Sequence, residues 1–325
     1  MSLEADQIVD RRNIRRKLTF WRVAAVLIAI AAALGAALLA TGRAPLATAT
    51  AGSIARITIT GLIRSNQERV EALDRLGRSS ARAVILHINS PGGTSAGAEE
   101  LHSALVRLKA KKPLVVVVDG LAASGGYITA IASDHIVSLE TSLVGSIGVL
   151  MQYPNISELM QTLGIKVETI RSTPLKAAPS GYEPTDPAAI EAIRSVVMDT
   201  YAWFRAMVKD RRGLDDASLE KVADGRVFTG RQALGLKLID ELGTEETALD
   251  WLAREKQVDR QSPVRDYPLQ ASFGDLTFLR VATTALDAVG LSKLSRHVAA
   301  WSAVQALESL NLDGILTLWH PPATN

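Results

Sequence analysis

The sequence predicts an α/β fold built around a largely parallel sheet. Short runs of branched apolar residues alternate with helix-compatible stretches from residue 54 to residue 170. Strands that alternate with helices are typical of parallel sheets joined by helical crossovers. Turns at Gly92, Ser124 and Ser146 follow the apolar runs. Ligands bind such sheets at the carboxyl ends of the strands, so we expect the site at these turns.

Each element has its own signal, taken in chain order. The strands are predicted from short runs rich in Val, Ile and Leu, over residues 54–60, 83–88, 114–118, 135–139 and 166–170. The helices between them are predicted over residues 66–78, 95–108, 124–132 and 156–163. In the first helix Val70, Leu73 and Leu76 recur at helical spacing, which indicates one buried face.

Two further elements follow. A long helix is predicted over residues 187–211, because an apolar stripe extends from Ile190 to Val208 and Gly213 is a typical helix stop. That stripe suits either an internal core or a neighbouring chain. Residues 228–242 are expected to form a helix and turn packed on the core, in which Asp240 is structural.

Composition limits the possible function classes. The chain has 325 residues, 47% of them hydrophobic, which is enough for one substantial domain with appendages. Its formal net charge is +2, so we expect no nucleic acid among its partners. It has no cysteine, which excludes disulfides, a thiol nucleophile and zinc–thiolate sites. We expect neither a metal nor any other cofactor.

The N-terminal region has the pattern of a membrane anchor. Six basic residues between positions 11 and 22 precede an uncharged run over residues 23–42. A helix of about twenty residues spans a hydrocarbon core of roughly 30 Å, and the basic flank stays in the cytoplasm. The alternative is a signal peptide cleaved within the small residues 48–55. We expect an uncleaved anchor, with Trp21 at the inner boundary.

Residues 119–132, DGLAASGGYITAIA, place Ser124 between a buried strand and a helix. Backbone N–H groups at such a junction are free to bind negative charge, and Gly125 and Gly126 leave room for a substrate carbonyl. An acyl-transfer nucleophile needs this arrangement. The alternative for Ser124 is a simple helix N-cap in a tight turn.

Two more segments help to decide whether Ser124 is a nucleophile or a helix cap. Residues 83–93, AVILHINSPGG, end in paired glycines that are suited to aim a backbone N–H at an oxyanion. Residues 171–184, RSTPLKAAPSGYEP, carry Lys176 in a loop without other charges nearby. No histidine is well placed along the chain to activate Ser124. The five histidines are His87, His102, His135, His297 and His320. A desolvated lysine amine is an alternative base.

With these motifs the chain resembles the signal peptide peptidase A family of membrane-bound serine proteases. The matching stretches occur in family order over about residues 54–251: HINSPGG, DGLAASGGYITA, SLVGSIGVLMQ, RSTPLKAAPSGYEPTD and GRVFTGRQALGLKLIDELG. The resemblance implies a Ser–Lys dyad of Ser124 as nucleophile and Lys176 as general base. It also implies oxyanion donors at Gly93 and Gly125, and a lysine-orienting role for Ser146. Where the family usually has an acidic residue after the lysine, this chain has Ala177 and Ala178.

The resemblance further implies the Clp protease and crotonase fold, and a half-length form with one protease unit per chain. The expected organisation is a cytoplasmic segment (1–22), an anchor (23–42), a linker (43–53), a protease domain (54–265) and a C-terminal helical extension (266–325). The protein is expected in the bacterial inner membrane, which one helix crosses, with the catalytic domain on the periplasmic side.

The expected substrates are cleaved signal peptides and other hydrophobic peptides near the membrane. The expected assembly is a ring of identical chains, an octamer if it follows half-length relatives. Whether Ser124 and Lys176 act within one chain or across neighbours stays open. Two other functions stay open as well: a crotonase-like acyl-CoA enzyme, and a non-catalytic membrane scaffold with a protease fold.

Overall fold

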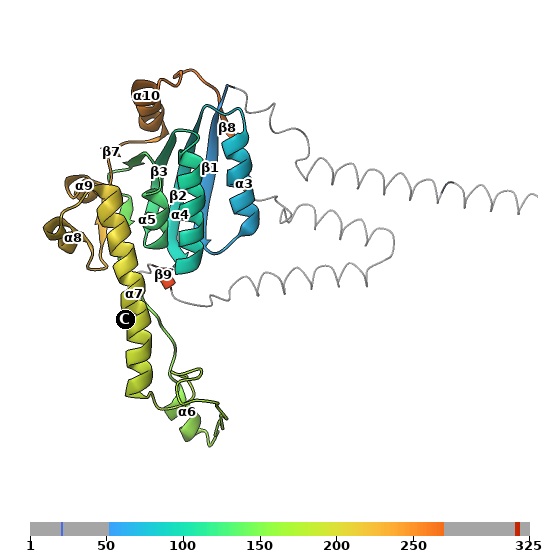
Figure 1. The fold of residues 1–325 in the computed structure, drawn as a ribbon, viewed down its shortest axis with the longest axis vertical. Coiled ribbons are helices and arrows are strands. Elements are labelled where there is room, and N and C mark those ends of the chain that lie inside the picture. The colour runs from blue at the N-terminus through green and yellow to red at the C-terminus, as the bar shows by residue number, and fades with distance from the viewer. Residues whose placement is uncertain (1–20, 22–51, 270–315, 319–325) are drawn as a thin grey trace, which may run out of the picture. The chain divides into compact units, whose positions relative to one another are not determined.

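The computed structural model describes Trp21, residues 52–269 and the backbone of residues 316–318 (Figure 1). The chain divides into two compact units, and the described residues other than Trp21 belong to the unit that holds residues 50–270 and 276–325. The expected cytoplasmic segment apart from Trp21, the anchor, most of the linker and most of the C-terminal extension lie outside the described residues. Among the described residues, no helix combines the length and the apolar character that crossing a bilayer requires.

One mostly parallel sheet forms the centre of this unit. Its main path runs in the order β6-β5-β3-β2-β1-β8, while β4 pairs with β3 and β7, and β9 pairs with β2. The described strands are β1 (Ile54–Ile63), β2 (Ala83–Thr94), β3 (Leu114–Ala123), β4 (His135–Ser138), β5 (Leu143–Gly145), β6 (Val227–Thr229), β7 (Glu241–Leu242), β8 (Val264–Asp266) and β9 (Leu316–Leu318). Only the β5–β6 and β2–β9 pairs are antiparallel among them. The predicted α/β class with a largely parallel sheet is therefore confirmed.

Helices cover both faces of the sheet (Figure 1). On one face Ile85, Val115 and Val137 pack in a buried cluster with Leu249 and Leu252 of α10. Because side chains alternate along a strand, the intervening buried residues of β2 face the other side, where α4 and α5 lie. The helices are α3 (Gln67–Arg78), α4 (Ser95–Lys109), α5 (Gly125–Ala130), α6 (Ser157–Thr162), α7 (Pro187–Arg212), α8 (Asp216–Val222), α9 (Gly230–Gly235) and α10 (Glu245–Lys256).

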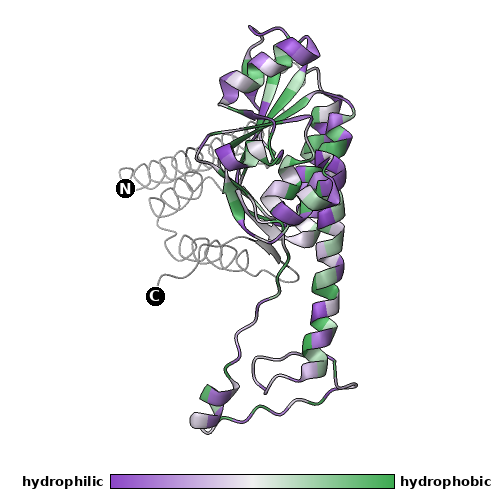
Figure 2. Cartoon of the chain, turned by 90° about the vertical axis from the view of Figure 1, so that its left-hand side faces the viewer, coloured by the Kyte–Doolittle hydropathy of each residue, from purple (hydrophilic) through white to green (hydrophobic). Residues whose placement is uncertain are grey.

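Helix α7 belongs to the core at one end and leaves it at the other (Figures 1 and 2). Phe204 and Val208, near its C-terminal end, are fully buried. Ile190, Val196 and Met198, in its N-terminal half, are 44%, 47% and 53% exposed. The helix ends at Gly213, whose φ of 59° is the left-handed value typical of a C-terminal cap. We call α6 and residues 163–186, which lie at the N-terminal end of α7 away from the sheet, the arm.

Most predicted elements are confirmed, but two expectations need correction. Residues 166–170 form no strand, because they lie in the arm without a paired strand, and Ile170 is fully exposed. Residues 228–242 form more than a helix and turn, since β6, α9 and β7 share them. Strand β5 was not predicted because a three-residue run gives no period to detect. Asp240 is structural as predicted: it pairs with Arg212 and accepts from the amide of Ile136.

We predict that truncating the same residue type at the two ends of α7 has unequal costs. Val208→Ala removes two fully buried methyl groups and should lower the free energy of unfolding by roughly 2 kcal/mol. Val196→Ala, at a half-exposed position of the same helix, should change it by less than about 0.5 kcal/mol. Chemical denaturation followed by circular dichroism gives both values. Equal costs would contradict the division of α7 into a packed and a projecting half.

Candidate active site

Ser124 lies at the junction of β3 and α5 with a strained backbone. Its φ and ψ are 54° and −114°, outside the regions that side chains with a Cβ normally occupy. The junction is held by hydrogen bonds from Ser124 N to Gly145 O, at 2.8 Å, and from Ile128 N to Ser124 O, at 2.9 Å. A strained residue that its surroundings hold in place is a frequent mark of a functional site.

Ser124 occupies the N-cap position of α5, which is the place that the alternative predicted. Its side chain, however, makes no capping hydrogen bond. The residue is only 1% exposed, so its hydroxyl is at the end of a buried strand as predicted. A sharp strand-to-helix turn with a serine at a positive φ resembles the backbone of a nucleophile elbow.

A second turn, Ser90 to Gly93, lies within β2 beside this junction. Gly92 has a φ of 108°, and a Cβ on Gly93 would lie 1.8 Å from the carbonyl oxygen of Ile63. Both positions therefore require glycine. The Ser90 hydroxyl donates to Gly61 O at 2.7 Å and accepts from the Gly92 amide at 3.1 Å. These bonds fix the backbone on which the expected oxyanion donor, Gly93, is carried.

The Ser90–Gly93 turn and the turn at Ser124 are in direct backbone contact. Ser90 pairs with Ala122 in the β2–β3 register, and a Cβ on Gly126 would lie 2.7 Å from Ser90 O. Gly125, the other expected oxyanion donor, comes directly after Ser124 and is buried. The predicted residues Gly93, Ser124 and Gly125 thus lie on backbone turns that are in contact. The role of Ser90 in this contact was missed; the available signal was a small hydroxyl residue directly before Pro-Gly-Gly.

Ser146 lies on the strand next to the Ser124 junction. Ala123 pairs with Gly145 in the parallel β3–β5 register, so Ser124 and Ser146 are the next residues on two neighbouring strands. Ser146 has a φ of 52°, is 7% exposed, and donates its amide to Arg226 O at 2.8 Å. Two serines with left-handed backbone therefore follow adjacent strand ends.

Lys176 lies elsewhere, in the arm. Its side chain is exposed, and its amide donates to Thr173 O at 3.1 Å. Within the described residues, no hydrogen bond connects Lys176 with Ser124 or Ser146. The structure of one chain therefore brings four predicted site residues together and leaves the predicted base on a segment that projects from the sheet (Figures 1 and 2).

The three histidines that the structure describes have other partners. His87 contacts Asp119 at 2.8 Å and Glu245 at 2.7 Å. His102 donates from Nδ1 to Ile128 O at 2.8 Å, and burial lowers its pKa so that its ring stays neutral. His135 stacks on Trp251 with ring centroids 4.7 Å apart. None of these three hydrogen-bonds Ser124. His297 and His320 lie outside the described residues.

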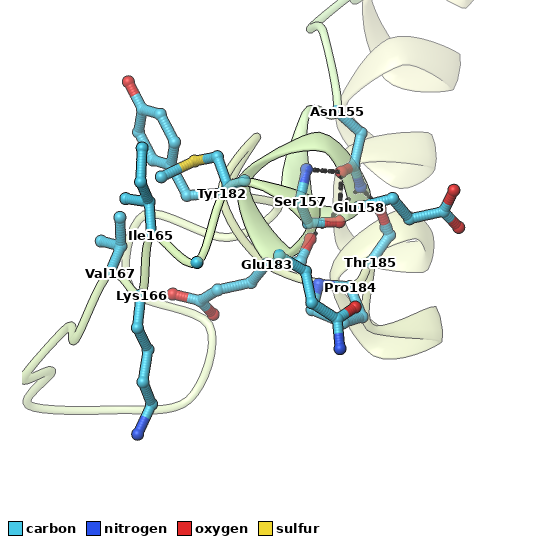
Figure 3. Close-up of a pocket in the computed structure, with 13 residues that line it drawn as sticks. Asn155, Ser157, Glu158, Ile165, Lys166, Val167, Tyr182, Glu183, Pro184 and Thr185 are labelled. Atoms are coloured by element: carbon cyan, nitrogen blue, oxygen red, sulfur yellow. Dashed lines mark hydrogen bonds between the residues drawn. The ribbon is translucent and has the colours of Figure 1, made fainter.

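The arm contains a hollow of its own (Figure 3). It has a volume of about 1060 Å³ and is lined by residues that include Asn155, Ile165, Lys166 and Tyr182. The guanidinium of Arg171 binds Glu183 at its edge through two contacts of 2.8 Å, which hold the pKa of that carboxyl below its usual value. None of the predicted site residues lines this hollow. Over the described part of the chain, no cluster of three or more His, Asp or Glu side chains has the arrangement of a metal site.

The comparisons with known proteins identify the family of the chain. Residues 106–259 match the model of peptidase family S49. "Putative protease slr0021" from Synechocystis sp. is 35% identical over 211 residues, which cover 64% of this chain and 76% of that protein. "Putative signal peptide peptidase SppA" from Enterococcus faecium is 33% identical over 180 residues, 55% of this chain and 52% of that protein. The chain belongs to peptidase family S49 and is a serine protease.

One solved structure aligns with part of this chain. It is a ClpP1 mutant from Listeria monocytogenes, with a TM-score of 0.39 and 16% sequence identity, over 58% of this chain and 91% of that chain. A serine protease of this family is neither a crotonase-like acyl-CoA enzyme nor a non-catalytic scaffold, so the sequence's two alternative functions are wrong.

We predict that Gly126→Ala disturbs the site while Gly235→Ala does not. The Cβ that this change adds at position 126 would lie 2.7 Å from a backbone oxygen of Ser90, so one of the two turns must shift. Overpacking of this kind costs about 1–3 kcal/mol of stability, and peptide hydrolysis should fall at least tenfold. Gly235, at the end of α9, has open space for a Cβ and is the matched control. Parent-like hydrolysis by the Gly126→Ala chain would show that contact between the turns is not needed.

Proposed function

We propose that the protein is a membrane-anchored endopeptidase that uses a Ser124–Lys176 dyad. The observation that carries this proposal is the strained, buried Ser124 junction without a histidine partner among the described residues. Neutral Lys176 takes the hydroxyl proton of Ser124, and the oxygen attacks a peptide carbonyl carbon. The amides of Gly93 and Gly125 bind the oxyanion. Lys176 then protonates the leaving amine, and water hydrolyses the acyl-enzyme.

The position of Lys176 supports a site shared between chains. A lysine is a useful base only where neighbouring atoms exclude water from its amine, and in one chain Lys176 is exposed. Ser146 is suited to orient an incoming lysine because it follows the strand next to Ser124. We therefore propose that the arm of one chain brings Lys176 to Ser124 and Ser146 of its neighbour.

Such contacts generate a ring when the rotation between chains closes. The apolar residues exposed on the arm and on the projecting half of α7 support an interface there, and they include Leu159, Leu163, Ile165 and Val196 (Figure 2). Exposed apolar surface marks many protein–protein contacts. By family resemblance we propose a homo-oligomeric ring, an octamer, with the Clp protease and crotonase type of fold.

The proposed substrates are cleaved signal peptides and other hydrophobic peptides at the outer side of the bacterial inner membrane. The apolar run at residues 23–42 supports a single-pass anchor with residues 54–265 in the periplasm. The name of the Enterococcus faecium relative supports the substrate class. The expectation is a preference for apolar residues at the cleavage site, which a peptide library measures directly.

We predict that a fluorophosphonate probe labels the parent chain at Ser124. Ser124→Ala should lose the label and at least a thousandfold of the peptide hydrolysis rate, because the nucleophile is absent. Circular dichroism should show an unchanged fold, since alanine keeps the buried position filled. Undiminished hydrolysis by the Ser124→Ala chain would exclude Ser124 as the nucleophile.

We predict that Ser124→Ala and Lys176→Ala chains restore each other's activity when co-assembled. Mixed oligomers contain junctions where an intact Ser124 meets an intact Lys176, so hydrolysis should return to a fraction of the parent rate. Lys166→Ala, at an exposed lysine of the same arm, is the control and should keep full activity alone. Mixtures that stay inactive after co-assembly is shown by cross-linking would place the dyad within one chain.

A further inference from the structure

His87, on β2, has a carboxylate at each of its two ring nitrogens. Its Nδ1 lies 2.8 Å from Asp119 Oδ1, on β3, and its Nε2 lies 2.7 Å from Glu245 Oε2, in the first turn of α10. An ionised carboxylate only accepts hydrogen bonds, and a neutral imidazole donates from only one nitrogen. Both contacts are therefore hydrogen bonds only when His87 carries two ring protons and a positive charge.

The charged groups around His87 hold Glu245 more firmly than Asp119. On β1, Arg56 donates to both carboxylate oxygens of Glu245, at 2.7 and 2.6 Å, and it also pairs with Asp266 of β8. The hydrogen bonds from Arg56, together with the one from His87, hold the pKa of Glu245 below its usual value, so this carboxylate stays ionised. The Asp119 side chain is 46% exposed, against 21% for Glu245. When His87 loses a proton, Asp119 is therefore the partner that turns to water, while Nε2–H stays on Glu245.

Asp119 belongs to a short bulge of β3 that leads to Ser124. In the β2–β3 register, three residues of β3, 119–121, lie opposite one residue of β2. The Ser142 hydroxyl lies 3.1 Å from both Val118 O and Asp119 O and so binds the backbone at the start of this bulge. The contact with His87 fastens the bulge through the Asp119 side chain.

We infer that His87 is a pH-sensitive latch, whose imidazolium ties the bulge at residues 119–121 to β2 and α10 and whose neutral form releases it. Imidazole is the side chain that ordinarily changes its charge between about pH 5 and 8. Because only the charged form makes both hydrogen bonds, the latch stabilises the fold at acid pH and is lost as the pH rises. It acts on the strand before Ser124 and requires no particular base for the reaction.

The first test is thermal unfolding of the full chain at about pH 5.5 and about pH 8. Asp119→Asn keeps the size of the side chain and adds an N–H donor, so a neutral His87 satisfies both partners. The Tm of the parent minus that of this variant should be greater at the acid pH by at least about 2 °C. The matched control is Asp199→Asn, at an exposed carboxylate of α7, whose Tm difference should not change with pH. A Tm difference for Asp119→Asn that is equal at both pH values would overturn the inference.

A second comparison identifies the group that titrates. In the His87→Gln chain, adding Asp119→Asn should change Tm equally at both pH values, because the side chain at position 87 no longer changes its charge. A pH-dependent change that persists in this background would assign the titration to another group and overturn the inference.

Hydrogen exchange tests the release of the bulge directly. At about pH 8 the amides of residues 119–123 should exchange at least about threefold faster in the parent than in the Asp119→Asn chain, after correction for intrinsic rates. At about pH 5.5 the two chains should exchange alike, since both keep the contact at His87. Equal exchange at both pH values would show that the bulge is not released, which would also overturn the inference.

Discussion

Close backbone contact between the ends of β2 and β3 is the constraint on which the rest of the structure depends. Gly126 lies against the backbone of Ser90, so no side chain separates the two turns there. Ser124 keeps a backbone conformation that costs about 1–3 kcal/mol, which the surrounding hydrogen bonds and buried strands offset. The register between the parallel strands fixes the position of Ser124. Because Ala122 pairs with Ser90 and Ala123 pairs with Gly145, the backbone of the next residue, Ser124, is held in one position.

Helix α7 connects this fixed region with the arm. Its Arg211 donates from Nε to Ile131 O at 3.0 Å and from Nη2 to Ala132 O at 3.1 Å, and so satisfies carbonyls just after α5. The neighbouring Arg212 pairs with Asp240, beside the Leu238 carbonyl that accepts the buried hydroxyl of Tyr127. The same helix thus holds the end of α5 at its C-terminal end and leads to the Lys176 segment at the other.

The fold class followed from the sequence because its signals are local. Branched runs such as residues 114–118 have the length of a buried strand, and amphipathic spacing predicted α3 and α7. Both central strands are longer than predicted, because β2 and β3 continue through Gly92–Gly93 and Gly120, where composition favours a turn. The strand expected over residues 166–170 is absent for the opposite reason: its pattern favours a strand, but a strand needs a neighbour with which to pair.

The sequence by itself determined the residue types of the site and their order: a serine before two glycines, a Ser-Pro-Gly-Gly turn, and a lysine in an uncharged loop. Only the tertiary structure decided which of them meet. Register between strands distant in sequence places Ser124 beside Ser146 and the Ser90–Gly93 turn, and it leaves an edge of β2 that β9 takes. The tertiary structure also places Lys176 away from the sheet, because the arm that carries it lies at the end of the projecting half of α7. The strand pairings join residues that are far apart in the sequence. Their energies therefore depend on residues that no short stretch of the sequence contains.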